Sequence, residues 1–304
     1  MNKILIIILA VSILGNLVGL FIAYKFLNTR DWLRQSETKL AEAQSSAAGL
    51  SEAVSAMTAR LDETDVTRMI FLHHSVGRGL LERGKLREQL LNRGILVKGA
   101  TFGDELGENT DMNFWLEKFR TQMPQMLSFK AHPNLYRSDS IRNDIVVFKS
   151  CFPNSDVVAD GTEPGDPRVP VRTIANYRAL FAELKQEFAK YPKTLFIYLT
   201  APPLVPELTT PENAKRARTF DTWVVNEFVS AYKQETGLDN FAAFDLFAVL
   251  ADSDNVLKAE YRQNIEGDSH PNTKGSRTAV EAFLRFFDPV CDARRTAARK
   301  VGPA

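Results

Sequence analysis

The sequence has 304 residues, of which 44% are hydrophobic and 25% are charged, as in an ordinary globular protein. Its formal net charge of +1 gives no reason to expect a broad basic surface for nucleic acid. Two cysteines, Cys151 and Cys291, exclude a disulfide framework and a cysteine zinc site. Whether they form one disulfide or stay as buried thiols is open.

Residues 1–27 are predicted to form a membrane anchor. The run from Ile4 to Tyr24 is almost entirely apolar, and its length of about 20 residues matches the hydrocarbon thickness of a bilayer. No small-residue cleavage site follows, so an uncleaved single-pass anchor is expected rather than a signal peptide. Basic residues after the span favour a cytoplasmic globular part, but long domains cross membranes regardless of such charges.

Residues 28–66 are predicted to form a helical stalk or linker. Glycine and proline are nearly absent, and apolar residues recur at loosely helical spacing, with Leu33 and Leu40, and Leu50 and Met57, each seven apart. A short coiled coil that forms a dimer and a solvated spacer are both compatible with this pattern, because too few heptads are present to decide.

Residues 67–290 are predicted to form one α/β domain, followed by a basic tail at 291–304. Apolar, β-branched runs predict strands at 68–74, 95–99, 144–149, 194–200 and 241–247. Helical periodicity predicts helices at 80–92, 114–127, 171–191, 211–236 and 274–287. Strands that alternate with helices of this length predict a parallel sheet with helices on both faces.

Ser75 is the candidate nucleophile. The first predicted strand ends in His73-His74-Ser75-Val76-Gly77, and the carboxyl ends of parallel strands are where such sheets bind ligands. Half of the Gly-x-Ser-x-Gly elbow is present, but His73 replaces the leading glycine, which argues against an ordinary α/β-hydrolase elbow. A serine is nucleophilic only when a base removes its proton.

His270 is the candidate base. It lies in Gly267-Asp268-Ser269-His270-Pro271, a loop of turn-forming residues before the last predicted helix. A histidine beside an aspartate can accept a proton and be stabilised as imidazolium. The alternative is a helix-start loop with an incidental histidine. Because this loop and the end of the first strand are both expected at the carboxyl edge of the sheet, Ser75 and His270 can meet.

An oxyanion hole would complete such a site. Candidate donors are the side-chain amide of Asn154, the backbone N–H of Gly103 and that of Ser75 itself. Taken singly, Asn154 and Gly103 are more often turn residues, and Gly99 and Gly107 compete with Gly103 for the role.

The order of these residues resembles the SGNH (GDSL-like) hydrolase superfamily, over about residues 68 to 289. Ser75 follows the first strand, Gly103 the second and Asn154 the third, with Asp268 and His270 before the final helix. The resemblance implies a three-layer α/β/α sandwich with a parallel, flavodoxin-like sheet. It also implies that Ser75 attacks an ester with His270 as base, while Gly103 and Asn154 bind the oxyanion.

Two features depart from that family. Its Gly-Asp-Ser opening is replaced here by His73-His74-Ser75. Its acid and histidine are usually three positions apart, whereas Asp268 lies two before His270, so Glu266 and Asp245 stay as alternatives for the acid.

The sequence therefore predicts a membrane-anchored serine esterase acting on a small-molecule or glycan ester, an acylated carbohydrate or a lipid. By analogy with the family, its globular part is expected outside the cytoplasm, with the bilayer as partner of the N-terminal helix. The alternatives are an acyltransferase to a glycan on the same fold and a non-catalytic, membrane-tethered binding or scaffold module. No cofactor is expected, and no metal, since the adjacent His73 and His74 would point to opposite faces of a strand.

Overall fold

The chain divides into two units, residues 1–60 and 61–304. The computed structural model describes residues 67–104, 106–129 and 142–301, with side chains up to residue 293. The predicted anchor at 1–27 and the predicted stalk at 28–66 lie outside the described residues. Within the described residues, no helix combines the length and the apolar character needed to cross a bilayer.

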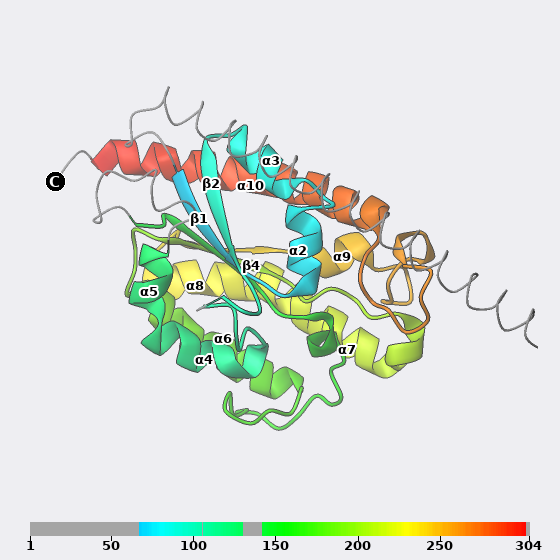
Figure 1. Cartoon of the computed structure of the whole chain (residues 1–304). Helices are drawn as coiled ribbons and strands as arrows, with labels where there is room; N and C mark the ends of the chain where they lie inside the picture. The colour runs from blue at the N-terminus through cyan, green and yellow to red at the C-terminus, as the bar shows by residue number, and fades with distance from the viewer. Residues whose placement is uncertain (1–66, 105, 130–141, 302–304) are drawn as a thin grey trace, which may run out of the picture. The chain divides into compact units, whose positions relative to one another are not determined.

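Five parallel strands form the central sheet (Figure 1). They are β1 (Thr67–Leu72), β2 (Ile95–Ala100), β3 (Ile145–Lys149), β4 (Leu195–Leu199) and β5 (Phe241–Phe244). Their order is β2-β1-β3-β4-β5, and every neighbouring pair is parallel. This is the strand order of flavodoxin-like sheets. The predicted α/β sandwich with a parallel sheet is therefore confirmed.

Helices cover both faces of this sheet because successive strand residues point to opposite sides. Ile70 and Leu72 of β1 pack into one hydrophobic cluster, and Met69 and Phe71 into the other. The first cluster is closed by α4 (Met112–Thr121), α5 (Met123–Ser128), α6 (Ile174–Ala189), α7 (Pro211–Trp223), the π-helical turn η5 (Val224–Phe228) and α8 (Val229–Thr236). The second is closed by α2 (Ser75–Leu81), α3 (Leu86–Leu91), α9 (Leu246–Leu250) and α10 (Thr273–Val301).

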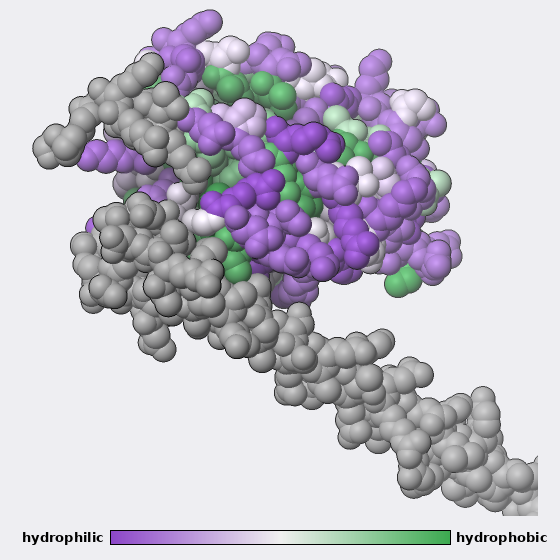
Figure 2. Space-filling view, turned by 90° about the horizontal axis from the view of Figure 1, so that it is seen from above, coloured by the Kyte–Doolittle hydropathy of each residue, from purple (hydrophilic) through white to green (hydrophobic). Residues whose placement is uncertain are grey.

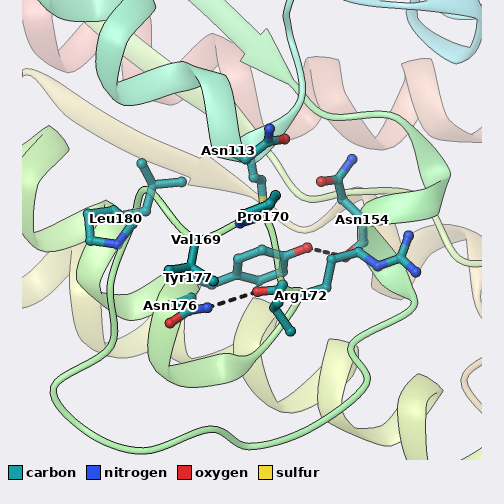
Figure 3. Close-up of a pocket in the computed structure, with 11 residues that line it drawn as sticks. Asn113, Asn154, Val169, Pro170, Arg172, Asn176, Tyr177 and Leu180 are labelled. Atoms are coloured by element: carbon teal, nitrogen blue, oxygen red, sulfur yellow. Dashed lines mark hydrogen bonds between the residues drawn. The ribbon is translucent and has the colours of Figure 1, made fainter.

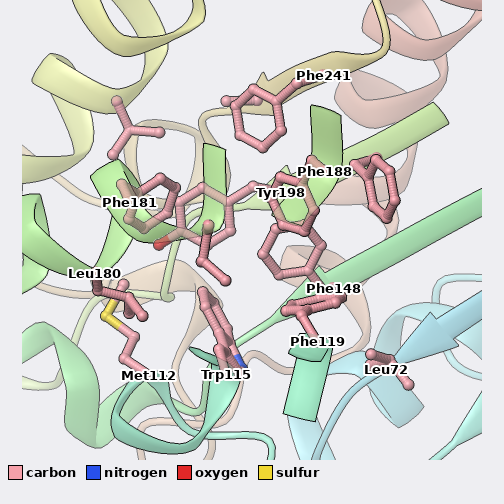
Figure 4. Close-up of a cluster of buried hydrophobic side chains, with 14 of the residues drawn as sticks. Leu72, Met112, Trp115, Phe119, Phe148, Leu180, Phe181, Phe188, Tyr198 and Phe241 are labelled. Atoms are coloured by element: carbon pink, nitrogen blue, oxygen red, sulfur yellow. The ribbon is translucent and has the colours of Figure 1, made fainter. Parts of the chain in front are cut away.

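Aromatic rings fill the first cluster (Figure 4). Trp115 of α4 makes T-shaped contacts with Phe148 of β3 and Tyr198 of β4, at centroid distances of 4.9 and 5.6 Å. Phe119, one turn along α4, contacts Phe148 and Phe188 in the same way. Each such pair adds about 0.5–1.5 kcal/mol beyond the buried area. This packing fixes α4 against the sheet, and with it Asp111, the residue before the helix.

The two predicted helices in the first half of the domain are each broken into two. The helix predicted at 80–92 consists of α2, which begins at Ser75, and α3, which begins after Lys85, a residue with a left-handed φ of 62°. The helix predicted at 114–127 consists of α4 and α5, with Pro124 in the first turn of α5. Proline removes a helical N–H donor, so a new helix starts there more readily than an old one continues.

The C-terminal part differs in two boundaries. The strand predicted at 241–247 ends at Phe244, because the carboxylate of Asp245 caps α9 by accepting from the Ala248 N–H at 2.8 Å. The helix predicted at 274–287 is longer, since α10 runs to Val301. It buries Phe283 and Phe287 and leaves its outer side to solvent. Seen from above, the described surface is mostly hydrophilic (Figure 2).

His73 is a core residue directly below the turn that carries Ser75. It is only 2% exposed, and its Nδ1 lies 2.7 Å from the His74 carbonyl oxygen, so Nδ1 carries the proton. The ring occupies space left free by Gly77 and Gly99, where an added Cβ would lie 2.3 Å from His73 Cβ and 2.8 Å from Nε2 respectively. Burial lowers the pKa of His73 to about 4.

His73 should therefore make the fold less stable in mildly acidic solution. Between its ordinary pKa of 6.5 and about 4, the unfolded chain binds a proton that the folded chain excludes, so the free energy of unfolding falls as the pH falls through this window. The shift corresponds to about 3 kcal/mol once the pH is below both values. His73→Gln keeps an N–H donor for the His74 carbonyl and should remove this part of the loss. Urea unfolding of both proteins at about pH 7 and about pH 4.5 measures it; an equal loss in both would contradict the assignment.

Candidate active site

Ser75 lies where β1 turns directly into α2. The apolar strand ends at Leu72, His74 has an extended backbone with φ of −107°, and Ser75 is the first residue of the helix. Ser75 is partly exposed, although its neighbours His74 and Val76 are buried. The serine hydroxyl is thus presented at the carboxyl edge of the sheet, as the sequence predicts.

His270 lies in a loop that is fastened on several sides. Asn272 donates through Nδ2 to the carbonyl oxygens of Glu260 and Arg262, both at 3.0 Å, and its Oδ1 caps α10 by accepting from the Gly275 N–H. The fully buried Ser269 accepts from the Val205 N–H at 3.0 Å, which ties the loop to the segment after β4. These bonds hold the His270 backbone at the same edge as Ser75.

The structure brings Ser75, His270 and Asp268 into hydrogen-bonding contact. Ser75 Oγ lies 2.6 Å from His270 Nε2, and Nδ1 of the same ring bonds the carboxylate of Asp268. Because a carboxylate can only accept, Nδ1 carries the proton and Nε2 is left to accept from the serine hydroxyl. The imidazole ring is nearly perpendicular to the ring of Phe152, at a centroid distance of 5.0 Å. The two hydrogen bonds give His270 the tautomer and orientation that a general base requires.

Asp268 is the carboxylate that contacts His270, and the two-residue spacing explains how. Its Oδ1 accepts from the backbone N–H of His270 at 2.9 Å as well as from the ring, so the loop curls around the carboxylate. Partial burial opposes the charge of Asp268, but the bonds from His270 and the charge of Arg83 outweigh it and lower the pKa of Asp268. Glu266 is exposed, and Asp245 caps α9 and bonds Arg218 at 2.7 Å.

Gly103 does not have the environment expected of an oxyanion donor. Its N–H donates to Glu108 Oε1 at 2.8 Å, within an exposed turn where its φ is +87°. The competing glycines have structural explanations. Gly99 makes room for His73, and a Cβ at Gly107 would lie 1.6 Å from the Thr101 carbonyl oxygen. Local structure therefore accounts for each of these three glycines without a role in an oxyanion hole.

Asn154 is buried in the 3₁₀ turn η3 (Phe152–Ser155), after β3. Its side-chain amide donates to Asp111 Oδ1 at 2.8 Å and to the Cys151 carbonyl oxygen at 3.2 Å. Both amide hydrogens are thus directed at acceptors of this chain. Phe152 of the same turn contacts His270, so η3 adjoins the Ser75–His270 pair.

Asp111 and Phe102 are neighbours of this site that sequence patterns did not single out. Asp111 bonds Asn154 and the Cys151 N–H, the latter at 3.3 Å, and lies 4.0 Å from His74 Nδ1. Phe102 is 55% exposed and stacks on the His74 ring at a centroid distance of 3.9 Å. An aspartate before a helix predicts only a cap, and an aromatic residue in a loop predicts nothing specific, so neither signal distinguishes them.

Asp111 acts electrostatically on two buried basic side chains, Lys149 and His74. Lys149 is fully buried, its Nζ donates to the Ser150 carbonyl oxygen at 2.6 Å, and burial lowers its pKa to about 8, against the charges of Cys151 and Asp111. Burial also lowers the pKa of His74, with Asp111 acting in the opposite direction. Lys149 therefore has no exposed surface with which to meet a substrate.

A small hollow of about 20 Å³ adjoins Asn154 (Figure 3). Its walls include Asn113, Val169, Val171 and Leu180, and the Tyr177 hydroxyl donates to the Asn154 carbonyl oxygen at 3.1 Å. The volume is that of about one water molecule. A larger groove of about 840 Å³ lies along β5, α8 and α10 and contains no predicted site residue other than Asp245.

Among the residues that the structure describes, no group of three or more histidine, cysteine or acidic side chains is placed to hold a metal ion. Cys151 and Cys291 are not joined by a disulfide. The polar side chains that meet at this edge of the sheet are Ser75, His270 and Asp268, with the amide of Asn154 in the adjoining turn.

No family model matches the sequence, and no curated protein matches it. Among solved structures, the chain is similar to a GDSL-like lipase from Bacteroides thetaiotaomicron, with a TM-score of 0.44 and 12% identity over 79% of this chain and 96% of that chain. It is also similar to a protein described as a lipolytic protein of the G-D-S-L family from Desulfitobacterium hafniense, with a TM-score of 0.41 and 15% identity over 72% of this chain and 98% of that chain. A third is described as a platelet activating factor from Streptococcus pneumonia, with a TM-score of 0.41 and 15% identity over 78% of this chain and 91% of that chain.

GDSL-like proteins are thus among the solved structures to which this chain is similar.

The bond between Asp268 and His270 should be visible in solution. A ring N–H that donates to a carboxylate is strongly deshielded, so we expect a far-downfield imidazole proton in the ¹H NMR spectrum. Asp268→Asn should abolish this signal, whereas Glu266→Gln, at an exposed position of the same loop, should leave it unchanged. A signal that survives in Asp268→Asn, or that disappears in Glu266→Gln, would assign the ring to a different partner.

Proposed function

We propose that the chain is a serine hydrolase of esters, with Ser75 as nucleophile, His270 as general base and Asp268 as the group that orients the base. The observation that carries this proposal is the pair of bonds on one imidazole, to Ser75 Oγ at 2.6 Å and to the Asp268 carboxylate. A serine hydroxyl becomes nucleophilic when a base lies within hydrogen-bond reach and is itself oriented by a third group. The partly exposed position of Ser75 supports access of a substrate.

In the acylation step, Ser75 Oγ attacks the ester carbonyl carbon while His270 Nε2 takes the hydroxyl proton. The imidazolium formed is stabilised by the carboxylate of Asp268, which stays ionised. Collapse of the tetrahedral intermediate breaks the bond to the alcohol oxygen, and His270 returns the proton to that oxygen. In the second step, a water molecule gives a proton to His270 and attacks the acyl carbon. Collapse of this second intermediate breaks the bond between the acyl carbon and Ser75 Oγ, His270 returns the proton to Oγ, and the acid is released.

The tetrahedral oxyanion needs donors in both steps. The N–H of Ser75 lies in the first turn of α2, where backbone N–H groups have no partner within the helix. Asn154 supplies a second donor if it releases the longer of its two amide bonds, the one to the Cys151 carbonyl oxygen at 3.2 Å. Gly103 is left out of the hole because its N–H is engaged with Glu108.

We propose an acylated carbohydrate or a lipid as the ester, on the resemblance to GDSL-like hydrolases. Transfer of the acyl group to a glycan instead of water uses the same acyl-enzyme and differs only in the second nucleophile. Product analysis with and without an added acceptor sugar separates the two, since transfer gives an acylated sugar in place of free acid.

Replacing Ser75 should abolish both labelling and hydrolysis. We expect a fluorophosphonate probe to label the wild-type chain and not Ser75→Ala, and hydrolysis of 4-nitrophenyl acetate to fall roughly 10³-fold or more in Ser75→Ala and in His270→Ala. Ser128→Ala, which removes an exposed serine of α5, is the matched control and should keep both signals.

Labelling that persists in Ser75→Ala would place the nucleophile elsewhere. A folded wild-type chain that neither reacts with the probe nor hydrolyses esters would favour the non-catalytic binding or scaffold module.

We further propose that residues 1–27 anchor the chain in a membrane, with the α/β domain outside the cytoplasm. The support is the uncharged run from Ile4 to Tyr24, which is long enough to span a bilayer. The two hydrophobic clusters of the described domain are closed by its own helices.

The anchor is tested by charges placed in the middle of the span. Each arginine at the centre of a membrane helix costs about 2.5–3.5 kcal/mol, so Leu9→Arg with Ile13→Arg in the full chain should shift most of the protein from the alkaline-washed membrane pellet to the supernatant. The same two charges in the predicted stalk, Leu33→Arg with Leu40→Arg, should leave the protein in the pellet. An unchanged distribution of the first variant would exclude this anchor.

A further inference from the structure

Asp111 lies at the start of a helix but does not cap it. It is the residue before Met112, the first residue of the ten-residue α4, and an aspartate there ordinarily accepts from the backbone N–H two or three residues on. The Asp111 side chain makes no such bond. A cap is typically worth about 1 kcal/mol, so the side chain forgoes a local stabilisation that its position offers.

The carboxylate instead reaches across to the turn after β3. Asp111 Oδ1 accepts from Asn154 Nδ2 at 2.8 Å and from the Cys151 N–H at 3.3 Å. The bond joins residues 43 positions apart and connects α4, which is fixed by the aromatic cluster, to η3, which adjoins His270. Asp111 thereby holds one hydrogen of the Asn154 amide in a set direction.

The negative charge of Asp111 is a cost for the proposed reaction unless it has this use. A basic group near it is the buried His74, whose Nδ1 lies 4.0 Å from Asp111 Oδ1. A negative charge close to a developing oxyanion raises the energy of the transition state. The benefit that offsets this is orientation of the donor, because an unfixed Asn154 amide would have to be ordered during the reaction.

We propose that Asp111 is a positioning residue for the reaction: by holding one amide hydrogen of Asn154, it directs the other toward the ester oxyanion. This inference rests on the proposed function of Ser75. The hydrogen directed at the oxyanion is the one that now makes the longer bond, to the Cys151 carbonyl oxygen at 3.2 Å. Asp111 itself touches neither substrate nor nucleophile in this scheme.

Two substitutions of Asp111 separate positioning from helix stability. In Asp111→Ser the short hydroxyl can cap α4 but cannot reach Asn154, so the thermal midpoint should be kept or raised while kcat for 4-nitrophenyl acetate falls about 10- to 10²-fold with KM nearly unchanged. In Asp111→Asn a side-chain oxygen of the same reach accepts from Asn154, so kcat should recover to within about fivefold of the wild type. Asp160→Ser, which removes an exposed carboxylate from the same edge of the sheet, is the charge control and should not change kcat.

A double-mutant cycle with Asn154 completes the test. Asn154→Ala alone should lower kcat about 10²- to 10³-fold, and Asp111→Ser should add no further loss in that background, because the group it positions is gone. Additive losses would overturn the proposal, as would an unchanged kcat in Asp111→Ser or an equal fall in Asp111→Asn and Asp111→Ser.

Failure of the proposed function has a different signature. It would show as hydrolysis that survives in Ser75→Ala, whereas the tether between Asp111 and Asn154 is read independently from the side-chain amide signals of Asn154 in ¹⁵N NMR. These signals should shift and lose their separation in Asp111→Ser. Asn154 signals that do not change would overturn the positioning role whatever the activity shows.

Discussion

The contact between Ser75 and His270 depends on the close approach of α2 to α10. An added Cβ at Gly84, just after α2, would lie 2.6 Å from Val280 Cγ2 and 2.9 Å from the Ser276 carbonyl oxygen. The missing side chain at Gly84 lets the end of this segment lie directly against α10. Since Ser75 is the first residue of α2 and His270 lies three residues before α10, this approach brings together two side chains that are 195 positions apart.

The fold could be predicted because the strands are buried on both faces. Segments such as Ile145–Lys149 are continuous apolar runs, and their alternation with helices leaves few arrangements other than a parallel sheet. Boundaries were less predictable where tertiary contacts decide them. Gly84 packs against α10 and Lys85 takes the left-handed conformation, so the break between α2 and α3 follows from packing that no local pattern contains. Asp245 likewise ends β5 by capping a helix that looks like strand continuation in the sequence.

Within the site, the residues that could be predicted are those whose neighbours in the chain already suggest chemistry. Ser75 follows a strand of apolar residues, and Asp268 and His270 share one loop, so the residues next to them in the sequence already indicate their roles. Asp111 and Asn154 could not be paired in this way, because 43 residues separate them and each has a simpler local explanation, a cap and a turn. Gly103, predicted as an oxyanion donor, is explained by its own turn. The turn needs a glycine at a φ of +87°, and the Gly103 N–H already donates to Glu108 there.

The two halves of this site are therefore built with different degrees of rigidity. His270 and Asp268 lie on a loop held by backbone-directed bonds from Asn272 and Ser269, so the base is oriented before any substrate arrives. The amide of Asn154 depends on a side-chain bond to a carboxylate that is itself partly exposed. In the proposed hydrolysis, a preorganised base activates the nucleophile before the substrate arrives, whereas a donor that must exchange the Cys151 carbonyl for the oxyanion acts only as negative charge develops. An exchange of this kind stabilises the transition state more than the ground state, which is the difference that catalysis requires.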